Sequence, residues 1–579
     1  MITSNQYDYL NRLTARSSAA AGKSVANYQY EYNSASQRTR VTLVDGSYWL
    51  YGYDALGQLT SANKYFWDST PVAGQQFHYT FDTIGNRTVA LAGGDAGGAN
   101  LRTNHYTNNL LNQITSRGVP GYVDVIGLTL ATNTVKVNGS NAYQKWEYFR
   151  DELAVNNASA ALWTNVTVTS GGQTNSGNIF VAKTPETFSY DLDGNLTNDG
   201  RWNYTWDAEN RLVNMTSLPS TPAASQYDLD LTYDYMGRRI QKIVSTMSGN
   251  SWVASYTYHF VYDGWNLVAI LDGGNNRLYS FTWGLDLSGS MQGAGGVGGA
   301  ISMTVYSGPN AGTYFYCYDG NGNVVALVNS ANGAIAAQYE YGPFGEVIRA
   351  TGPMAKLNPF MFSTKFYDWE TGLYYYGHRY YNPSTGRWPS RDPMGDTAFA
   401  TFHEFTDDEL QGVGDTEGNA ANLYSFVANQ PLTQWDYLGL ITVGGGVPTR
   451  GIFEHNSYLT FTVTCPLCQQ VVYSSVDYSG AVPALERLFG KSRVDSLAGP
   501  IPPATGLGGF RGYGGIPYGP NCNGKPVEVQ VYMRTRFASY TFGSAAAAAA
   551  YAAGTVINYN CIQCSLYTPG PGNPVLPNP

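Results

Sequence analysis

Four of the six cysteines in this chain form two Cys-x-x-Cys pairs near its C-terminus. Cys465 and Cys468 lie in CPLC, and Cys561 and Cys564 lie in CIQC. Four thiolates presented in pairs can hold zinc in a tetrahedral site, so we expect zinc as a cofactor here. The pairs are 93 positions apart, from Cys468 to Cys561, which is wider than in a compact zinc ribbon. Disulfides are the alternative if the segment matures outside the cell, and free thiols are the third interpretation.

An acidic segment, residues 396–418, is a second place where side chains could do chemistry. Its carboxylates are potential cation ligands, but their spacing matches no calcium-binding loop. We therefore interpret the segment as a solvated surface insertion in which the histidine is structural. The residues concerned are His403, Asp407, Asp408, Glu409, Asp415 and Glu417.

The elements that position such residues are predicted by a repeated aromatic-Asp motif. In each copy an aromatic residue at a strand end precedes an Asp, and a Gly or Asn three or four residues later can reverse the chain with positive φ. This pattern predicts β-hairpins, which together form a continuous sheet. Copies begin at Tyr7, Tyr53, Phe81, Tyr190, Trp206, Tyr233, Tyr262 and Tyr318.

Composition agrees with an all-β protein, since 47 Tyr and 66 Gly with only 13% charged residues suit aromatic cross-strand pairs and many turns. The net charge of −9, without any run of five Lys or Arg, excludes nucleic acid as a partner of the sheet. No apolar run is long enough to predict a membrane span. Residues 1–20 contain no apolar core of a signal peptide. Because the repeats start at Tyr7, we expect the chain to be the C-terminal piece of a longer protein.

Three segments interrupt or follow the repeats. Residues 122–183 alternate Val and Thr with Asn-Gly turns, which predicts a small inserted β-sandwich whose exposed aromatic residues could contact carbohydrate. Composition predicts that Gly289–Gly299 is a flexible linker. Residues 441–579 lack the repeats and contain SAAAAAAYAAG from Ser544, a predicted helix, so we expect a variable α+β domain there. His455 is the segment's only His, and no nucleophile with a base is evident.

The last repeats are followed by GLYYYGHRYYNPSTGRWPSRDPMG from Gly372, NLYSFVANQP from Asn422 and WDYLGL from Trp435. This order resembles the RHS/YD-repeat family and its repeat-associated core domain over most of residues 1–440. Members of that family include the C components of insecticidal Tc toxins and many polymorphic toxins. It implies a spiralling, cocoon-like β-sheet shell around a variable C-terminal segment.

The resemblance also implies an aspartic-type autoprotease in the core domain. Its catalytic residues fall on Arg379, Asp392 and Asp436, and the cut falls between Leu440 and Ile441. Peptide hydrolysis by carboxyl groups needs one ionised group to activate water and one protonated group to donate to the leaving amine. The alternative is that both Asp residues are turn residues that accept backbone N–H groups. This chain departs from the family where Tyr437 replaces the usual Pro, and in the long acidic segment.

These observations predict five segments: shell at 1–121 and 184–346, the inserted sandwich at 122–183, the core domain at 347–440, and the variable domain at 441–579. The expected function is to enclose or carry that variable domain as an effector-like cargo and to release it by self-cleavage. We expect a secreted or cell-surface protein with immunity or delivery proteins as partners. The alternatives are a cell-surface, carbohydrate- or cell-binding YD-repeat protein without cleavage, and an inactive remnant.

Overall fold

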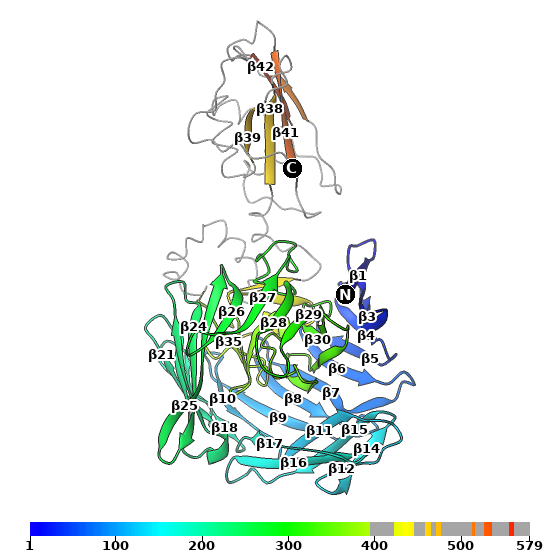
Figure 1. The fold of residues 1–579 in the computed structure, drawn as a ribbon, viewed down its shortest axis with the longest axis vertical. Helices are drawn as coiled ribbons and strands as arrows, with labels where there is room; N and C mark the ends of the chain where they lie inside the picture. The colour runs from blue at the N-terminus through cyan, green and yellow to red at the C-terminus, as the bar shows by residue number, and fades with distance from the viewer. Residues whose placement is uncertain are drawn as a thin grey trace. The chain divides into compact units, whose positions relative to one another are not determined.

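A computed structural model describes residues 1–393 and 422–444, with five further strands near the C-terminus (Figure 1). The chain divides into two compact units, Met1–Ala400 with Thr416–Gly446, and Thr401–Asp415 with Val447–Pro579. In the second unit the five strands form one sheet in the order β39-β38-β41-β42-β40. These strands are β38 (Tyr458–Thr464), β39 (Val471–Ser475), β40 (Gly512–Gly515), β41 (Pro526–Arg534) and β42 (Thr555–Asn560).

The first unit begins with an 11-stranded antiparallel sheet in which the first ten strands pair in chain order and β18 closes the edge. Its strands are β1 (Ile2–Tyr7), β2 (Leu13–Ala20), β3 (Lys23–Tyr32), β4 (Arg38–Leu43), β5 (Tyr48–Tyr53), β6 (Leu59–Tyr65), β7 (Pro71–Phe81), β8 (Arg87–Gly93), β9 (Leu101–Asn108), β10 (Ile114–Arg117) and β18 (Glu186–Thr187).

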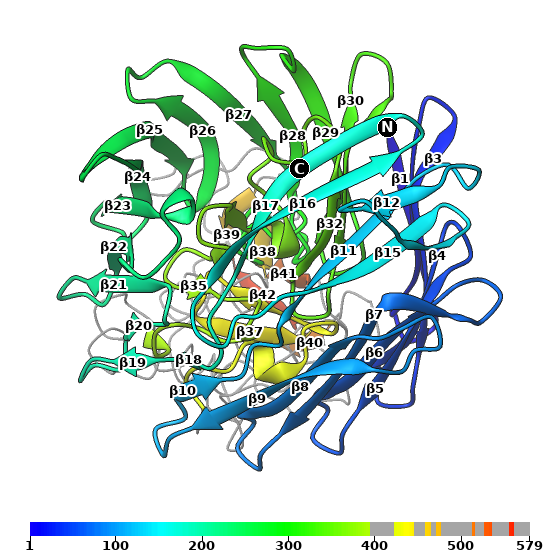
Figure 2. The same ribbon diagram turned by 90° about the horizontal axis from the view of Figure 1, so that it is seen from below.

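A 14-stranded antiparallel sheet follows, again with every strand paired to its neighbours in sequence. Figure 2 shows the two sheets following one another around a common interior. The strands are β19 (Ser189–Tyr190), β20 (Leu196–Asn198), β21 (Trp202–Trp206), β22 (Leu212–Ser217), β23 (Tyr227–Tyr233), β24 (Arg239–Ser248), β25 (Ser251–Asp263), β26 (Asn266–Asp272), β27 (Arg277–Trp283), β28 (Ala300–Val305), β29 (Gly312–Tyr318), β30 (Val324–Asn329), β31 (Ile335–Tyr341) and β32 (Val347–Thr351). The predicted all-β shell is confirmed.

The Tyr-Asp motif explains why these hairpins form. In the turn between β5 and β6, Asp54 Oδ1 accepts the backbone N–H of Leu56 at 3.0 Å and of Gln58 at 2.8 Å. The hydroxyl of Tyr53 donates at 2.7 Å to the carbonyl of Arg38, the first residue of the preceding strand β4. The Asp thus closes its own turn, and the Tyr ties that turn to its neighbour. The same tyrosine bond recurs at Tyr32, Tyr233, Tyr262 and Tyr341.

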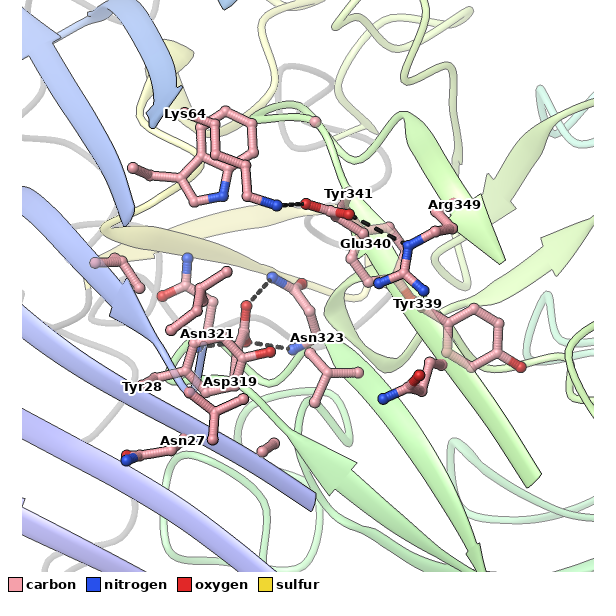
Figure 3. Close-up of a pocket in the computed structure, with 18 of the residues that line it drawn as sticks. Asn27, Tyr28, Lys64, Asp319, Asn321, Asn323, Tyr339, Glu340, Tyr341 and Arg349 are labelled. Atoms are coloured by element: carbon pink, nitrogen blue, oxygen red, sulfur yellow. Dashed lines mark hydrogen bonds and ion pairs between the residues drawn. The ribbon is translucent and has the colours of Figure 1, made fainter. Parts of the chain in front are cut away.

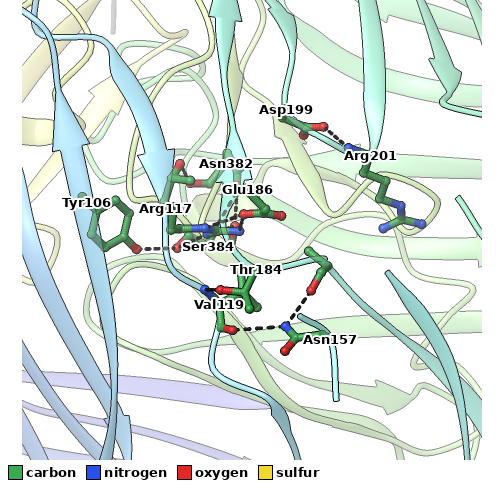
Figure 4. Close-up of polar contacts among 12 residues, drawn as sticks. Tyr106, Arg117, Val119, Asn157, Thr184, Glu186, Asp199, Arg201, Asn382 and Ser384 are labelled. Carbon is green, nitrogen blue, oxygen red and sulfur yellow. Dashed lines mark hydrogen bonds and ion pairs between the residues drawn. The ribbon is translucent and has the colours of Figure 1, made fainter. Parts of the chain in front are cut away.

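Residues 122–181 leave the shell as two small sheets, ordered β11-β15-β14 and β13-β12-β16-β17. Their apolar core contains Val135, Val137 and Phe149. The strands are β11 (Tyr122–Leu128), β12 (Val135–Val137), β13 (Ser140–Asn141), β14 (Tyr143–Lys145), β15 (Tyr148–Ala154), β16 (Leu162–Ser170) and β17 (Gln173–Val181). Polar contacts gather where the chain leaves and returns, and Asn157 donates to the carbonyls of both Val119 and Ala182 (Figure 4).

The Gly-rich segment Gly289–Gly299 is packed, so its prediction as a flexible linker was wrong. Ala294 and Val297 are fully buried. The carboxylate of Asp286 accepts the backbone N–H of Ala294 at 2.7 Å and of Gly296 at 3.1 Å. Composition suggested flexibility, but a buried carboxylate satisfies the backbone donors and holds the loop in one conformation.

The core domain fills the interior with aromatic side chains. Its elements are the 3₁₀ turns η2 (Phe362–Thr364) and η4 (Val427–Asn429), and the strands β33 (Phe366–Asp368), β34 (Leu373–Tyr375), β35 (Tyr380–Tyr381), β36 (Gln434–Tyr437) and β37 (Ile441–Gly444). The rings of Tyr381 and Phe426 stack with centroids 3.9 Å apart. The hydroxyls of Tyr374 and Tyr381 donate to the shell-turn carbonyls of Gly345 and Phe344. The domain is therefore bonded to the shell that surrounds it.

One 3₁₀ turn, η1 (Ala223–Ser225), lies in the connection between β22 and β23. In the part of the chain that the structure describes, we find no helix with the length and apolar character needed to cross a membrane.

Candidate active site

The three residues assigned to self-cleavage meet in the core domain, although they lie on separate elements. Arg379 lies between β34 and β35, Asp392 follows β35, and Asp436 lies on β36. Arg379 Nη2 is 2.7 Å from Asp392 Oδ2 and 3.8 Å from Asp436 Oδ2. One guanidinium nitrogen therefore lies within ion-pair distance of both carboxyl groups.

Arg379 is held rigidly, with a side chain that is only 2% exposed. Its guanidinium lies over the ring of Trp388, 4.0 Å from the ring centroid. Nη1 donates to the carbonyl of Leu423 at 3.3 Å, and Nε donates to the carbonyl of Gly439. The planar guanidinium thus connects the two carboxyl groups to the backbone of the turn that contains the assigned cleavage position.

Asp436 has the more perturbed environment of the two carboxyl groups. Its side chain is 2% exposed, against 22% for Asp392. Burial is the largest cause that raises the pKa of Asp436, to about 7; Asp392 contributes to the rise, while Arg379 and Lys365 oppose it. Asp436 Oδ1 also accepts the backbone N–H of Gly439 at 2.5 Å. Asp436 therefore also has the turn contact that the alternative interpretation predicts. At neutral pH Asp436 exists in both protonation states.

The assigned cleavage position lies in a tight hairpin between β36 and β37, in which Tyr437 pairs with Ile441. Leu438 and Gly439 both have positive φ, 56° and 80°. A leucine in this region is uncommon, and such a conformation typically costs on the order of 1–3 kcal/mol. His378 N–H donates to the Leu438 carbonyl at 3.0 Å, which helps to hold the turn. The chain is thus strained immediately before the assigned cut.

Lys365 is a functional candidate that sequence reasoning missed. It is buried, and its Nζ donates to the Gly295 carbonyl at 2.8 Å. Burial lowers the pKa of Lys365 to about 8, and Asp436 and Asp286 oppose the decrease. No pattern around this residue distinguishes a buried lysine from a surface one, because its burial depends on the loop Gly289–Gly299.

The remaining sequence-based site predictions lie outside the described residues. They are the cysteines Cys465, Cys468, Cys561 and Cys564, the acidic segment, and the helix from Ser544. Within residues 1–393 and 422–440, no group of three or more His, Cys, Asp or Glu side chains could hold a metal ion. Zinc, disulfides and free thiols at the four cysteines therefore all stay predictions.

Comparison with known protein families gives two matches. Residues 165–432 match the teneurin YD-shell family, and residues 32–64 match the RHS repeat. The first match includes Arg379 and Asp392 and ends just before Asp436.

Several individual proteins are similar over part of the chain. The tRNA3(Ser)-specific nuclease WapA of Bacillus spizizenii is 35% identical over 209 residues, covering 36% of this chain and 8% of that protein. The double-stranded DNA deaminase toxin A of Burkholderia cenocepacia is 24% identical over 228 residues, covering 38% of this chain and 16% of that protein. The crystal structure of TcdB2-TccC3-Cdc42 aligns with a TM-score of 0.33 at 17% identity, covering 76% of this chain and 21% of that one. This chain therefore spans a small part of the length of these relatives.

Proposed function

We propose that this chain, which is an RHS/YD-repeat shell protein, cuts its own backbone between Leu440 and Ile441 and so separates residues 441–579 from the shell. The observation that carries the proposal is the position of Arg379 Nη2, within 4 Å of both Asp392 and Asp436. Two carboxyl groups in one buried site with a shared cation suit hydrolysis by an acid and a base.

The environments of the two carboxyl groups support different roles for them in the proposed reaction. Asp392 is the more exposed and forms the close ion pair with Arg379, so it acts as the ionised base that removes a proton from water. The water oxygen attacks the carbonyl carbon of Leu440. Asp436, whose pKa is raised to about 7, is the acid that protonates the nitrogen of Ile441 as the carbon–nitrogen bond breaks. The products are a new carboxylate at Leu440 and a new amine at Ile441.

The backbone contacts of Arg379 support a positioning role in the same step. Nε donates to the carbonyl of Gly439, one residue before the peptide that breaks. His378 N–H holds the carbonyl before that. Together they fix the approach of the chain to the two carboxyl groups, which lowers the entropy lost on reaching the reactive geometry.

We further propose that residues 441–579 are an effector that the shell carries as cargo. The support comes from relatives, because two of them are named as a nuclease and as a deaminase toxin. In this proposal the protein acts outside the producing cell, and immunity or delivery proteins bind it.

Denaturing gel electrophoresis of the purified chain tests the cleavage. The uncut chain has a mass of 63.0 kDa, and the 139 residues after Leu440 are 139/579 of the chain, or about 15 kDa. We expect the short fragment from the wild type, with Ile441 as its first residue by N-terminal sequencing. Asp392→Asn should leave one intact band.

Asp272→Asn is the control, because Asp272 accepts the backbone N–H groups of Gly274 and Asn276 in a shell turn, which is the role that the alternative interpretation gives to Asp392. It should be cut like the wild type. Near-ultraviolet circular dichroism checks that Asp392→Asn is folded. An intact wild-type chain, or a short fragment from folded Asp392→Asn, would refute the proposed reaction.

A further inference from the structure

A cavity of about 320 Å³ lies between the beginning and the end of the shell wall (Figure 3). One side is formed by residues of β3–β6, and the other by the turn between β29 and β30 together with residues of β30–β32. The two sides touch beside the cavity, where Val25 and Ala26 pack against Val325 and Ala326. The size is that of pockets that hold small molecules.

The charged side chains of the cavity balance one another. Its lining contains three cations, Arg38, Lys64 and Arg349, and three acids, Asp45, Asp319 and Glu340, so their formal charges sum to zero. Glu340 pairs with Lys64 on one side and with Arg349 at 3.5 Å on the other (Figure 3).

Asp319 also has hydrogen-bond partners within the protein. Its carboxylate accepts the backbone N–H groups of Asn321 and Asn323, each at 2.9 Å, as part of a shell turn. Arg38 donates to the side chain of Asn321 and to the carbonyls of Leu432 and Gly320. Since these charged groups already have partners within the protein, an ionic ligand would gain little from them and would lose its hydration.

Neutral polar groups of the cavity are available instead. In the described parts of the chain, the side chains of Asn27, Tyr28, Tyr51 and Gln338 line the cavity and form no hydrogen bond with protein. Two phenols and two amides can both donate and accept hydrogen bonds. A wholly apolar ligand would leave these groups unpaired, which is costly.

The walls between these groups are aromatic. Tyr28 and Tyr30 stack with ring centroids 6.3 Å apart, and Trp49 and Tyr51 stack at 6.3 Å. These aromatic residues line the same cavity as the neutral hydroxyl and amide groups. Such a combination complements a ring that has an apolar face and a hydroxylated edge.

We propose that this cavity binds a neutral saccharide unit of one or two rings. The aromatic faces contact the C–H face of the sugar, and the free phenol and amide groups pair with its hydroxyls. The site is remote in sequence from Arg379 and is independent of the cleavage reaction.

Ligand-detected NMR on the full chain tests the site, with maltose, cellobiose, lactose and N,N′-diacetylchitobiose as probes. We expect at least one to bind with a dissociation constant of millimolar or below. Tyr28→Phe removes one hydroxyl and Gln338→Leu replaces one amide, so each should weaken binding about tenfold. Tyr9→Phe, at a fully exposed turn position, is the matched control and should change nothing.

Two further comparisons sharpen the test. Glucose 6-phosphate should bind more weakly than glucose, because Arg38, Lys64 and Arg349 already donate to groups of the protein. A protein-bound glycan is distinguished from a free sugar by comparing two proteins. Ribonuclease B carries neutral glycans, and ribonuclease A lacks them. Binding of either the glycan or a free sugar supports the site. The proposal is overturned if no probe or glycan binds, if Tyr28→Phe binds as well as the wild type, or if the phosphorylated sugar binds better.

Discussion

A buried ion cluster anchors the core domain to the shell, and Asp368→Asn should break it. Asp368 Oδ2 is 2.7 Å from Arg239 Nη1, and Asp368 Oδ1 is 2.6 Å from Lys242 Nζ. All three side chains are at most 3% exposed. Arg239 and Lys242 belong to β24 of the shell, whereas Asp368 ends β33 of the core domain.

The expected loss in free energy of unfolding depends on the partners that Lys242 and Arg239 keep in Asp368→Asn. Lys242 keeps Glu370 at 2.8 Å, but the Nε and Nη2 atoms of Arg239 have no hydrogen-bond partner among the described residues. Arg239 would therefore stay buried without a carboxylate. Removing one partner of a buried ion pair costs about 3–5 kcal/mol, which we expect as the loss in free energy of unfolding at pH 7.

Arg238 and Asp234 provide the matched control, because they form a pair at the same 2.7 Å distance with side chains 15–16% exposed. Asp234→Asn should cost about 1 kcal/mol or less. Guanidinium unfolding followed by near-ultraviolet circular dichroism measures both variants, with midpoints compared at equal slope.

The pH dependence supplies a second check on Asp368. Arg239 and Lys242 lower the pKa of Asp368 in the folded protein, against the opposing and largest effect of burial. A lowered pKa stabilises the fold above the unfolded-state value of about 4, and the contribution is lost as the pH falls through the folded-state value. The difference between Asp368→Asn and wild type should therefore shrink towards pH 3. A loss below about 1 kcal/mol at pH 7 would refute the anchoring role.

Three further predictions concern the cleavage site. The rate of self-cleavage should fall about tenfold per pH unit above pH 7, because Asp436 must be protonated and its pKa is about 7; a rate that rises with pH would contradict its role as the acid. In the uncut Asp392→Asn background, adding Asp436→Asn removes the second carboxylate beside the buried Arg379, so the free energy of unfolding should fall by about 3–5 kcal/mol at pH 8; guanidinium denaturation measures this, and an unchanged stability would count against an ion pair between Arg379 and Asp436. Gly439→Ala should slow cleavage at least tenfold on a gel time course, because φ is +80° and the new Cβ would lie 3.1 Å from Arg379 N. Gly139 is the matched control, since its φ is +86° and a Cβ there would meet open space. Gly139→Ala should leave the cleavage rate unchanged.

Much of the shell could be predicted from sequence because its hairpins are local. The turn at Asp54 is closed by backbone groups two and four residues away, so the information needed lies within one motif. Sheet order followed from the same property, since each strand pairs with its neighbours in sequence. The Gly-rich segment was predicted wrongly because its order depends on Asp286 and on packing of Val297, which composition does not reveal.

Part of the candidate site could also be predicted from sequence, and part depends on tertiary structure. Arg379, Asp392 and Asp436 were assigned by family resemblance, and local patterns alone describe the two Asp residues equally well as turn residues. The raised pKa of Asp436 and the lowered pKa of Lys365 arise chiefly from burial by segments far away in sequence. Local hydrogen bonds can therefore be predicted from the sequence by itself. The desolvation of Asp436 and Lys365, and the contact of Arg379 with both carboxyl groups, arise only when distant segments pack together, so the tertiary structure decides them.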